Sequence, residues 1–363
     1  MGPARLAAVL RGVAPSVAWE AVLAGRLVLP GGRGRGRVRA PGGDEGHDLV
    51  ATWRRRARAT DVEAGWEALR AAGVRAHVRG WAGYPGPLDG DPEAPAVLFS
   101  RGDVATIEGR RVAIVGSRDC SRYGREVAFA LGRDLATAGV GVVSGLALGV
   151  DGAAHRGCLK AGGAPPLAVV GSGLDIVYPK AHRDLWKEVA SAGAVVSEAP
   201  LGAAPEAWRF PARNRVIAAL AEVVVVVESR HRGGARHTVA AAMARDRPVL
   251  AVPGPVHSLT SELPNSLLAD GCHPARDAVD VLVALQLCSP ADRSAGPTDP
   301  RPPPAEPDKS VLDAVGWSPA SFEEVVLASG RSPAEVGLAL AHLERDGWVA
   351  GSGGWWERRS DRS

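Results

Sequence analysis

Short apolar runs alternate with stretches of helical periodicity between residues 111 and 287. The runs consist mainly of Val, Leu, Ile and Ala and lie at 112–115, 140–143, 167–170, 194–196, 223–227 and 249–252. Near-continuous branched apolar residues are typical of strands buried on both faces, and helices between such strands are typical of βαβ units. The pattern therefore predicts an α/β domain at residues 81–288, with a doubly wound, mostly parallel sheet.

The segment that follows this domain has a different composition. Residues 289–308 combine Pro, Ser and charged residues without apolar periodicity, which predicts an extended Pro-rich linker. Helical patterns then cover 311–315, 322–328 and 332–346, before a Gly-rich hairpin that ends at Trp355 and Trp356. Three short helices and a hairpin predict a winged-helix domain at residues 309–357.

The N-terminal part, residues 1–80, is predicted to be a small, basic, helical and partly flexible region. A turn-prone stretch at 30–46 alternates glycines with four arginines, which are Arg33, Arg35, Arg37 and Arg39. Gly-Arg alternation disfavours regular structure. We favour a solvated basic loop here over a phosphate-binding segment.

Composition narrows the class of protein. With 46% hydrophobic and 23% charged residues the chain is typical of a globular protein, and a net charge of +3 does not by itself indicate a nucleic-acid partner. The four cysteines form no C-x-x-C pair, so we expect no metal site, no disulfides and a reducing compartment. No apolar run approaches the roughly 18 residues of a membrane span, and residues 1–24 lack the pattern of a secretory signal. We therefore expect a cytoplasmic protein without membrane contact.

Gly and Ser residues follow four of the predicted strands. They form Gly116-Ser117-Arg118, Ser144-Gly145, Gly171-Ser172-Gly173, and Glu228-Ser229 followed by Gly233-Gly234. In a doubly wound sheet, ligands bind beyond the carboxyl ends of the strands, where helix N-termini offer free N–H groups to anions. One glycine after a strand is usually a turn, but the four loops together predict a binding rim. Arg118 adds a guanidinium suited to phosphate.

A second candidate segment begins at Phe210. Because Pro211 favours the first turn of a helix, Phe210, Arg213, Asn214 and Arg215 are expected at a helix start. A nucleic-acid base could stack on Phe210 while the arginines hold phosphates. Core packing of Phe210 and ordinary ion pairs of the arginines are an equally good alternative.

Asp151 and His155 are four residues apart, which places them on one face of a helix. The pair resembles an acid–base couple. However, Asp at a helix start is a common cap, and no Ser or Cys nucleophile with an orienting partner accompanies the pair. The P-loop motif of nucleoside triphosphatases, G-x-x-x-x-G-K-[ST], is also missing from the sequence. We therefore expect both residues to be structural and predict that the chain is not an enzyme.

These motifs, in their order along the chain, resemble the DprA/Smf family of DNA-processing proteins. The matching residues are Gly116-Ser117-Arg118, the run 144–151 with Ala154-His155, Gly171-Ser172-Gly173-Leu174-Asp175 with Tyr178-Pro179, Phe210-Pro211 with Arg213-Asn214-Arg215, and Val252-Pro253-Gly254. Ordered motifs over about 140 residues are specific. Tyr84-Pro85 and residues 95–99 also resemble the family, and the C-terminal module resembles its winged helix.

The resemblance implies a Rossmann-like domain that binds single-stranded DNA without strong sequence preference. It also implies a homodimer that protects incoming DNA and loads the RecA recombinase in transformation or recombination, with neither catalysis nor a cofactor. The residues then expected at the nucleic acid are Gly116, Ser117, Arg118, Ser144, Gly145, Gly171, Gly173, Phe210, Arg213, Asn214, Arg215, Gly233, Gly234 and Thr238. Asp151, His155 and Glu228 are expected to be structural residues near this site. Leu267 and Leu268 are expected near a dimer surface, with buried helix packing as an equally good alternative.

The chain departs from the family pattern after Glu228, where the usual Ser-Gly-Ser-Leu-x-Thr-Ala run is replaced. The residues found there are Arg232-Gly233-Gly234-Ala235-Arg236-His237-Thr238-Val239, which add cations to the groove. Residues 1–60 match the family only loosely.

The winged module departs in its charge. Its third helix carries Glu335, Glu344 and Asp346 beside Arg345 and His342. This is a poor charge balance for a helix in a major groove, so the module could bind protein instead of DNA.

Two alternative functions use the same rim. One is a nucleotide phosphoribohydrolase of the lysine-decarboxylase-like type, whose characteristic motif is P-G-G-x-G-T followed by Glu. The nearest segment in this chain, from Arg232 to Thr238, lacks the Pro and the second turn Gly of that motif. The other is a nucleotide sensor whose site sets the state of the winged module. A DNA-binding mediator without turnover is the favoured hypothesis, and saturable binding of a free nucleotide would favour the sensor.

Overall fold

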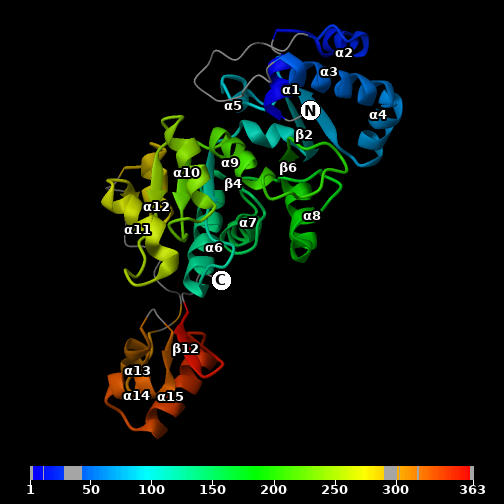
Figure 1. The fold of residues 1–363 in the computed structure, drawn as a ribbon. Coiled ribbons are helices and arrows are strands. Elements are labelled where there is room, and N and C mark those ends of the chain that lie inside the picture. The colour runs from blue at the N-terminus through cyan, green and yellow to red at the C-terminus, as the bar shows by residue number, and fades with distance from the viewer. Residues whose placement is uncertain are drawn as a thin grey trace.

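The computed structural model describes residues 3–10, 12–27, 43–289, 301, 303–316 and 319–359. Within these ranges it contains a nine-stranded sheet and a three-stranded sheet. Figure 1 shows the larger sheet with its helices in the middle, helices α1 to α4 beside it, and the C-terminal helices and strands as a separate body.

The nine-stranded sheet has the order β1-β2-β6-β5-β4-β3-β7-β8-β9. Its strands are β1 (Arg75–Val78), β2 (Val97–Gly102), β3 (Arg111–Val115), β4 (Gly141–Ser144), β5 (Leu167–Val169), β6 (Ala194–Ser197), β7 (Val223–Val226), β8 (Val249–Ala251) and β9 (His273–Pro274). Neighbouring strands from β6 to β9 pair in parallel. β2 is antiparallel to β6, and β1 is antiparallel to β2.

The apolar runs form the strands because their side chains are buried on both faces of the sheet. Every residue of β3 and of β7 is buried, and alternate residues enter two different core clusters. Ala113 and Val115 face one cluster, whereas Val112 and Ile114 face the other. The predicted fold class, a Rossmann-like doubly wound and mostly parallel sheet with a C-terminal winged helix, is confirmed.

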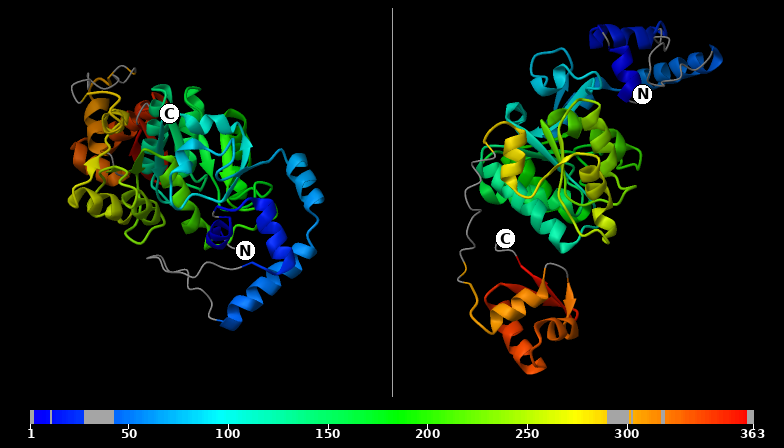
Figure 2. Two further views of the ribbon diagram at one scale, coloured as in Figure 1. Left: turned by 90° about the horizontal axis from the view of Figure 1, so that it is seen from above. Right: turned by 90° about the vertical axis from the view of Figure 1, so that its left-hand side faces the viewer.

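Helices cover both faces of this sheet, as the right-hand view of Figure 2 shows. One core cluster joins the sheet to α9, α10 and α11, and the opposite face packs against α6, α7, α8 and α12. The helices of this domain are α5 (Gly86–Asp89), η1 (Val104–Glu108), α6 (Arg122–Thr137), α7 (Val150–Ala161), η2 (Lys180–His182), α8 (Arg183–Ala192), α9 (Arg209–Leu220), α10 (Ala235–Met243), η3 (Leu259–Ser261), α11 (Glu262–Ala269) and α12 (Ala278–Ala284).

The N-terminal region contains the helices α1 (Pro3–Val9), α2 (Pro15–Ala24), α3 (Gly43–Arg58) and α4 (Val62–Ala71). Val22 and Trp53 belong to a small buried cluster that holds α1 to α3 together. Of the predicted basic loop at 30–46, residues 30–42 lie outside the described residues. The last four residues are helical, contrary to the prediction, because α3 begins at Gly43 and continues into the buried cluster. The sheet begins at β1, before the expected domain boundary at residue 81.

The C-terminal domain contains α13 (Asp308–Val315), β10 (Ala320–Ser321), α14 (Phe322–Ser329), α15 (Pro333–Arg345), β11 (Val349–Ser352) and β12 (Trp355–Arg358). Capping boxes fix two helix starts: Ser321 with Glu324 begins α14, and Ser332 with Glu335 begins α15. The strands pair in the order β10-β12-β11 and cover one apolar cluster, which is the architecture expected for a winged helix.

In the part of the chain that the structure describes, no helix combines the length and the apolar character needed to cross a bilayer.

Candidate functional site

A cleft opens where the winding of the sheet reverses. From β3 the chain winds through β4, β5 and β6 toward one edge, and from the neighbouring β7 it winds through β8 and β9 toward the other. Ligands of doubly wound folds bind at such a switch point, outside the carboxyl ends of the two strands. A cleft of about 680 Å³ lies there, lined by residues 115–119 at the end of β3 and by the first half of α9. The residues after β7 that line it are Ser229, Arg230, Gly233, Gly234, Ala235, His237 and Thr238.

Most of the predicted site residues meet in this cleft. The predicted residues that line it are Gly116, Ser117, Arg118, Phe210, Arg213, Asn214, Gly233, Gly234 and Thr238. Gly145 and Gly171 line a smaller cavity of about 60 Å³ that shares Arg118, Phe210 and Arg213 with the cleft. Two of the four predicted strand-end loops, those after β3 and β7, thus line the cleft together with α9, and the loops after β4 and β5 line the smaller cavity.

Arg118 and two aromatic rings form the exposed wall of the cleft. The Arg118 guanidinium carbon lies 4.8 Å from the centre of the Phe210 ring, which is cation–π distance. The ring of Tyr178 lies 5.4 Å from Phe210 on a plane tilted by 36°. Arg118 is exposed and Tyr178 is 40% exposed. Flat apolar faces and a cation are therefore available side by side to a ligand.

Arg213, in contrast, is buried beneath the cleft. Its guanidinium donates to the carbonyl oxygen of Val169 and lies next to Asp151. Burial lowers the pKa of Arg213 to about 10, and the Asp151 carboxylate opposes that shift. Gly145 packs against this guanidinium so closely that a Cβ atom would overlap its nitrogen atoms. The Arg213 guanidinium therefore lines the bottom of the cleft as a positive charge held in one position.

Asp151 and His155 lie on the first turns of α7 and are buried. Asp151 accepts the Gly145 N–H at 3.1 Å, and burial raises the pKa of its carboxyl. The His155 ring is fully buried, and burial lowers its pKa to about 3. The structure therefore offers no exposed acid–base pair at this position.

Glu228 is a buried carboxylate at the end of β7. It accepts hydrogen bonds from the Ser121 N–H at 2.8 Å and from the Ser121 hydroxyl at 2.6 Å, and Ser121 in turn caps α6. A carboxylate at a helix N-terminus is favoured by the helix dipole. Glu228 thereby fixes the start of α6 against the loop that follows β7.

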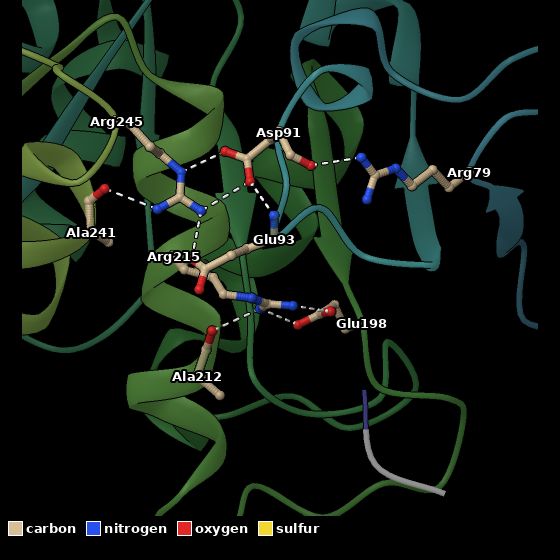
Figure 3. Close-up of polar contacts among 8 residues, drawn as sticks. All are labelled: Arg79, Asp91, Glu93, Glu198, Ala212, Arg215, Ala241 and Arg245. Atoms are coloured by element: carbon tan, nitrogen blue, oxygen red, sulfur yellow. Dashed lines mark hydrogen bonds and ion pairs between the residues drawn. The ribbon is translucent and has the colours of Figure 1, made fainter. Parts of the chain in front are cut away.

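Arg215 lies away from the cleft. Phe210, Arg213, Asn214 and Ile217 line the cleft from one face of α9, with the helical spacing i, i+3, i+4 and i+7. Arg215 lies off this face and forms a two-pronged pair with Glu198, both contacts being 2.5 Å long (Figure 3). The alternative of an ordinary ion pair therefore describes Arg215 in this structure.

The same close-up shows a second arginine pair beside Arg215. Arg245, which lies two residues after the end of α10, binds the carboxylate of Asp91 with two nitrogens and reaches Glu93 at 2.9 Å (Figure 3). Asp91 and Glu93 belong to the segment between α5 and β2. The two pairs fasten that segment and β6 to the helices α9 and α10 that carry the cleft.

Four further predicted residues are not part of the cleft lining. Ser144 is buried and donates to the carbonyl of Ile114 at 2.6 Å. The Gly173 N–H donates to Ala203 at 2.9 Å. Leu267 is 5% exposed and belongs to the sheet core, and Leu268 is partly buried against the same cluster. Helix packing is thus the interpretation that describes Leu267 here.

Sequence reasoning left some cleft residues without a role. Tyr178 was part of a matching motif and His237 was part of the run that departs from the family pattern, but neither was assigned to the site. Asp119 and Arg230 were not considered. The signal for Arg230 and His237 is their position on either side of the paired glycines, in the loop after β7 and in the first turn of α10. In total, the cleft lining includes three guanidinium groups, of Arg118, Arg213 and Arg230, and two carboxylates, of Asp119 and Asp151.

Comparisons with known proteins agree with this architecture. The sequence matches the family model for DNA recombination-mediator protein A at residues 77–286 and that for the DprA winged helix domain at residues 295–354. Protein Smf of Escherichia coli is 34% identical over 280 residues, which cover 76% of this chain and 75% of that protein. DNA processing protein DprA of Streptococcus pneumoniae is 37% identical over 204 residues, which cover 56% of this chain and 72% of that protein.

Two solved structures resemble the chain. DNA processing protein A from Streptococcus pneumoniae superposes with a TM-score of 0.59 at 33% identity, covering 64% of this chain and 81% of that one. DNA processing protein A from Helicobacter pylori, whose structure was described for its single-stranded DNA binding mode, superposes with a TM-score of 0.53 at 25% identity. That match covers 59% of this chain and 97% of the Helicobacter chain.

A switch-point cleft in a doubly wound domain, followed by a winged helix, defines a DNA-processing protein of the recombination-mediator class. The chain belongs to the DprA/Smf family.

Proposed function

We propose that the cleft binds single-stranded DNA and that the protein acts as a recombination mediator without turning over a substrate. The observation that carries this proposal is the wall of Arg118, Phe210 and Tyr178 at the switch point of the sheet. Aromatic faces stack on any base, and a guanidinium beside them holds the phosphate that joins two bases. Single-stranded DNA presents both groups together.

The contacts available in the cleft suit binding that tolerates any sequence. Gly234, whose Cβ position is open, lets a phosphate approach the backbone closely, and Arg118 and Arg213 supply positive charge. Phosphate contacts position a strand but do not distinguish bases. We therefore expect strongly salt-dependent affinity and little preference between sequences of equal length.

The absence of turnover rests on the position of the acid–base candidates. Asp151 and His155 are buried, and Asp151 is engaged with the backbone at Gly145 and the charge of Arg213. A general base must reach the proton that it removes, and a fully enclosed imidazole does not. A displacement assay tests this point against the enzyme and sensor alternatives. Labelled single-stranded DNA bound to the protein should be displaced by unlabelled single strands and retained against free mononucleotides, which should also be recovered intact.

The proposed mediator role extends to protecting incoming DNA, loading RecA and acting as a homodimer. Its support is membership of a family described as DNA recombination mediators. The direct test measures how fast RecA forms filaments on single strands already covered by a single-strand-binding protein. Wild-type protein should shorten the lag, and an Arg118→Ala variant should not. An equal lag with and without the wild type would reject the loading role but leave DNA binding in place.

A further inference from the structure

The loop after β7 carries a group of cations at the edge of the cleft. Arg230, Arg232 and Arg236 are all exposed, and Arg230 lines the cleft itself. The N–H of Gly233 donates to the carbonyl of Arg230 at 2.8 Å, which closes a tight turn. Such a turn keeps the first and fourth Cα atoms within about 7 Å. Arg232 therefore lies in a turn whose two ends both line the cleft.

Arg236 is held near the same edge by the start of α10. Its N–H donates to the carbonyl of Gly233 at 3.3 Å, and it is the second residue of the helix. Its neighbours Ala235 and His237 both line the cleft, and Asn214 of α9 donates to the Gly234 carbonyl at 3.3 Å. The loop is thereby tied to the helix that carries Phe210.

These three guanidinium groups are available to a ligand. Among the described residues, none of them takes part in an ion pair or a side-chain hydrogen bond, unlike Arg215 and Arg245. The acidic side chain in contact with the loop is Glu262, which accepts the His231 backbone N–H at 3.0 Å. The other acidic residue at the end of β7, Glu228, is buried and bound to Ser121. The exposed edge therefore has a net positive charge.

We propose that Arg232 and Arg236 form an outer phosphate-binding site that holds a single strand after it leaves the cleft past Arg230. The inference rests on the proposed function, because it assumes that single-stranded DNA occupies the cleft. Three unpaired guanidinium groups beside a ligand cleft suit a backbone with one phosphate per nucleotide. Because the loop from Ser229 to Thr238 contains no Phe, Tyr or Trp, its arginines are the main ligand-binding groups and they hold phosphates.

The test compares strand lengths. Oligothymidines of about 4 and about 20 nucleotides are bound to wild type and to the Arg232→Ala/Arg236→Ala variant, the short one by displacement of a labelled strand. The long strand should bind the variant about tenfold more weakly, and its logarithmic salt slope should fall by about 1.4, which corresponds to two lost phosphate contacts. The affinity for the short strand should not change.

A matched control removes two other exposed arginines. Arg56 and Arg58 lie on α3 in the N-terminal region, and the Arg56→Ala/Arg58→Ala variant has the same net charge as the test variant. It should bind both strands like the wild type. If the test variant loses affinity for both lengths equally, or for neither, the outer site is rejected while binding in the cleft stands. If the wild type binds neither length, the proposed function itself fails.

Discussion

The guanidinium of Arg118, at the end of the central strand β3, lies 4.8 Å above the ring of Phe210, at the start of α9. The two residues are 92 positions apart in the chain, and the switch point of the sheet brings them together. Their pairing places a phosphate-binding guanidinium next to a ring on which a base can stack. A strand bound here would have adjacent places for its backbone and for a base.

Replacing Phe210 should weaken DNA binding without unfolding the protein. Loss of one stacked base corresponds to about 1–3 kcal/mol, so Phe210→Ala should raise the Kd for single-stranded DNA about fivefold to 150-fold. Phe210→Trp keeps an aromatic face and should retain most of the affinity. Titration of a labelled oligothymidine measures both variants, and equal affinity of Phe210→Ala and wild type would count against stacking at this ring.

Arg215 should matter for stability and not for DNA. Its side chain is 22% exposed and its partner Glu198 is 13% exposed, so removing the arginine leaves a largely buried carboxylate without its partner. Arg215→Ala should lower the free energy of unfolding by about 2 kcal/mol, measured by urea denaturation. Arg345 is the control, because its side chain and that of its partner Asp346 are 70% and 51% exposed, and Arg345→Ala should leave the urea midpoint close to that of the wild type. A reduced salt slope of DNA binding in Arg215→Ala would contradict this assignment.

Gly145 should be intolerant of a side chain. A Cβ atom there would overlap the guanidinium of Arg213, which is held by Val169 and Asp151 and has little room to move. Gly145→Ala should lower the free energy of unfolding by about 1–3 kcal/mol. Gly234→Ala is the control, because its Cβ atom would meet nothing within 4 Å. Thermal melting of both variants measures this loss of stability. Equal melting temperatures would contradict the prediction, because they would mean that the Arg213 side chain moves aside at little cost.

His155 should make the fold sensitive to mild acid. Burial holds the pKa of its ring at about 3, whereas an unfolded histidine titrates near pH 6.5. Between these values the unfolded chain binds a proton that the folded chain does not, so the free energy of unfolding falls as the pH falls, by up to about 1.4 kcal/mol per unit. Above pH 6.5 both states are neutral at this residue and the dependence ends.

The variant His155→Leu removes this proton site. Urea midpoints at about pH 7.5 and about pH 5 should show that wild type loses about 2 kcal/mol more than the variant over this interval. His182, whose pKa burial also lowers, is present in both proteins and cancels in the difference. Parallel losses in the two proteins would mean that the His155 ring is protonated in the folded state.

Much of the fold could be predicted from the sequence because its signals are local. Each of the six apolar runs forms a strand within one residue of the predicted bounds, since strands buried on both faces leave an uninterrupted apolar pattern. The apolar pattern of the sequence did not predict β1 and β2. Their burial alternates or is only partial, as expected of antiparallel strands at the edge of a sheet, so their apolar residues are diluted by polar ones.

The site could be predicted to the level of loops but not of individual side chains. Glycines after strands mark the rim, whereas the role of Arg215 depends on Glu198, which a separate strand presents to it. The helical spacing of Phe210, Arg213 and Asn214 already places Arg215 on another face of α9, and this signal was in the sequence. The burial of Leu267 depends on the sheet that α11 covers, which the local sequence does not record.

The most direct test of the central claim is the fluorescence anisotropy of a labelled single-stranded oligonucleotide, titrated at two salt concentrations with wild type and with Arg118→Ala, beside a duplex of the same sequence. Binding to the single strand should weaken as salt rises, exceed binding to the duplex, and fall about tenfold or more in Arg118→Ala. Failure of the wild type to bind the single strand, or equal binding by the two proteins, would contradict the assignment of this cleft.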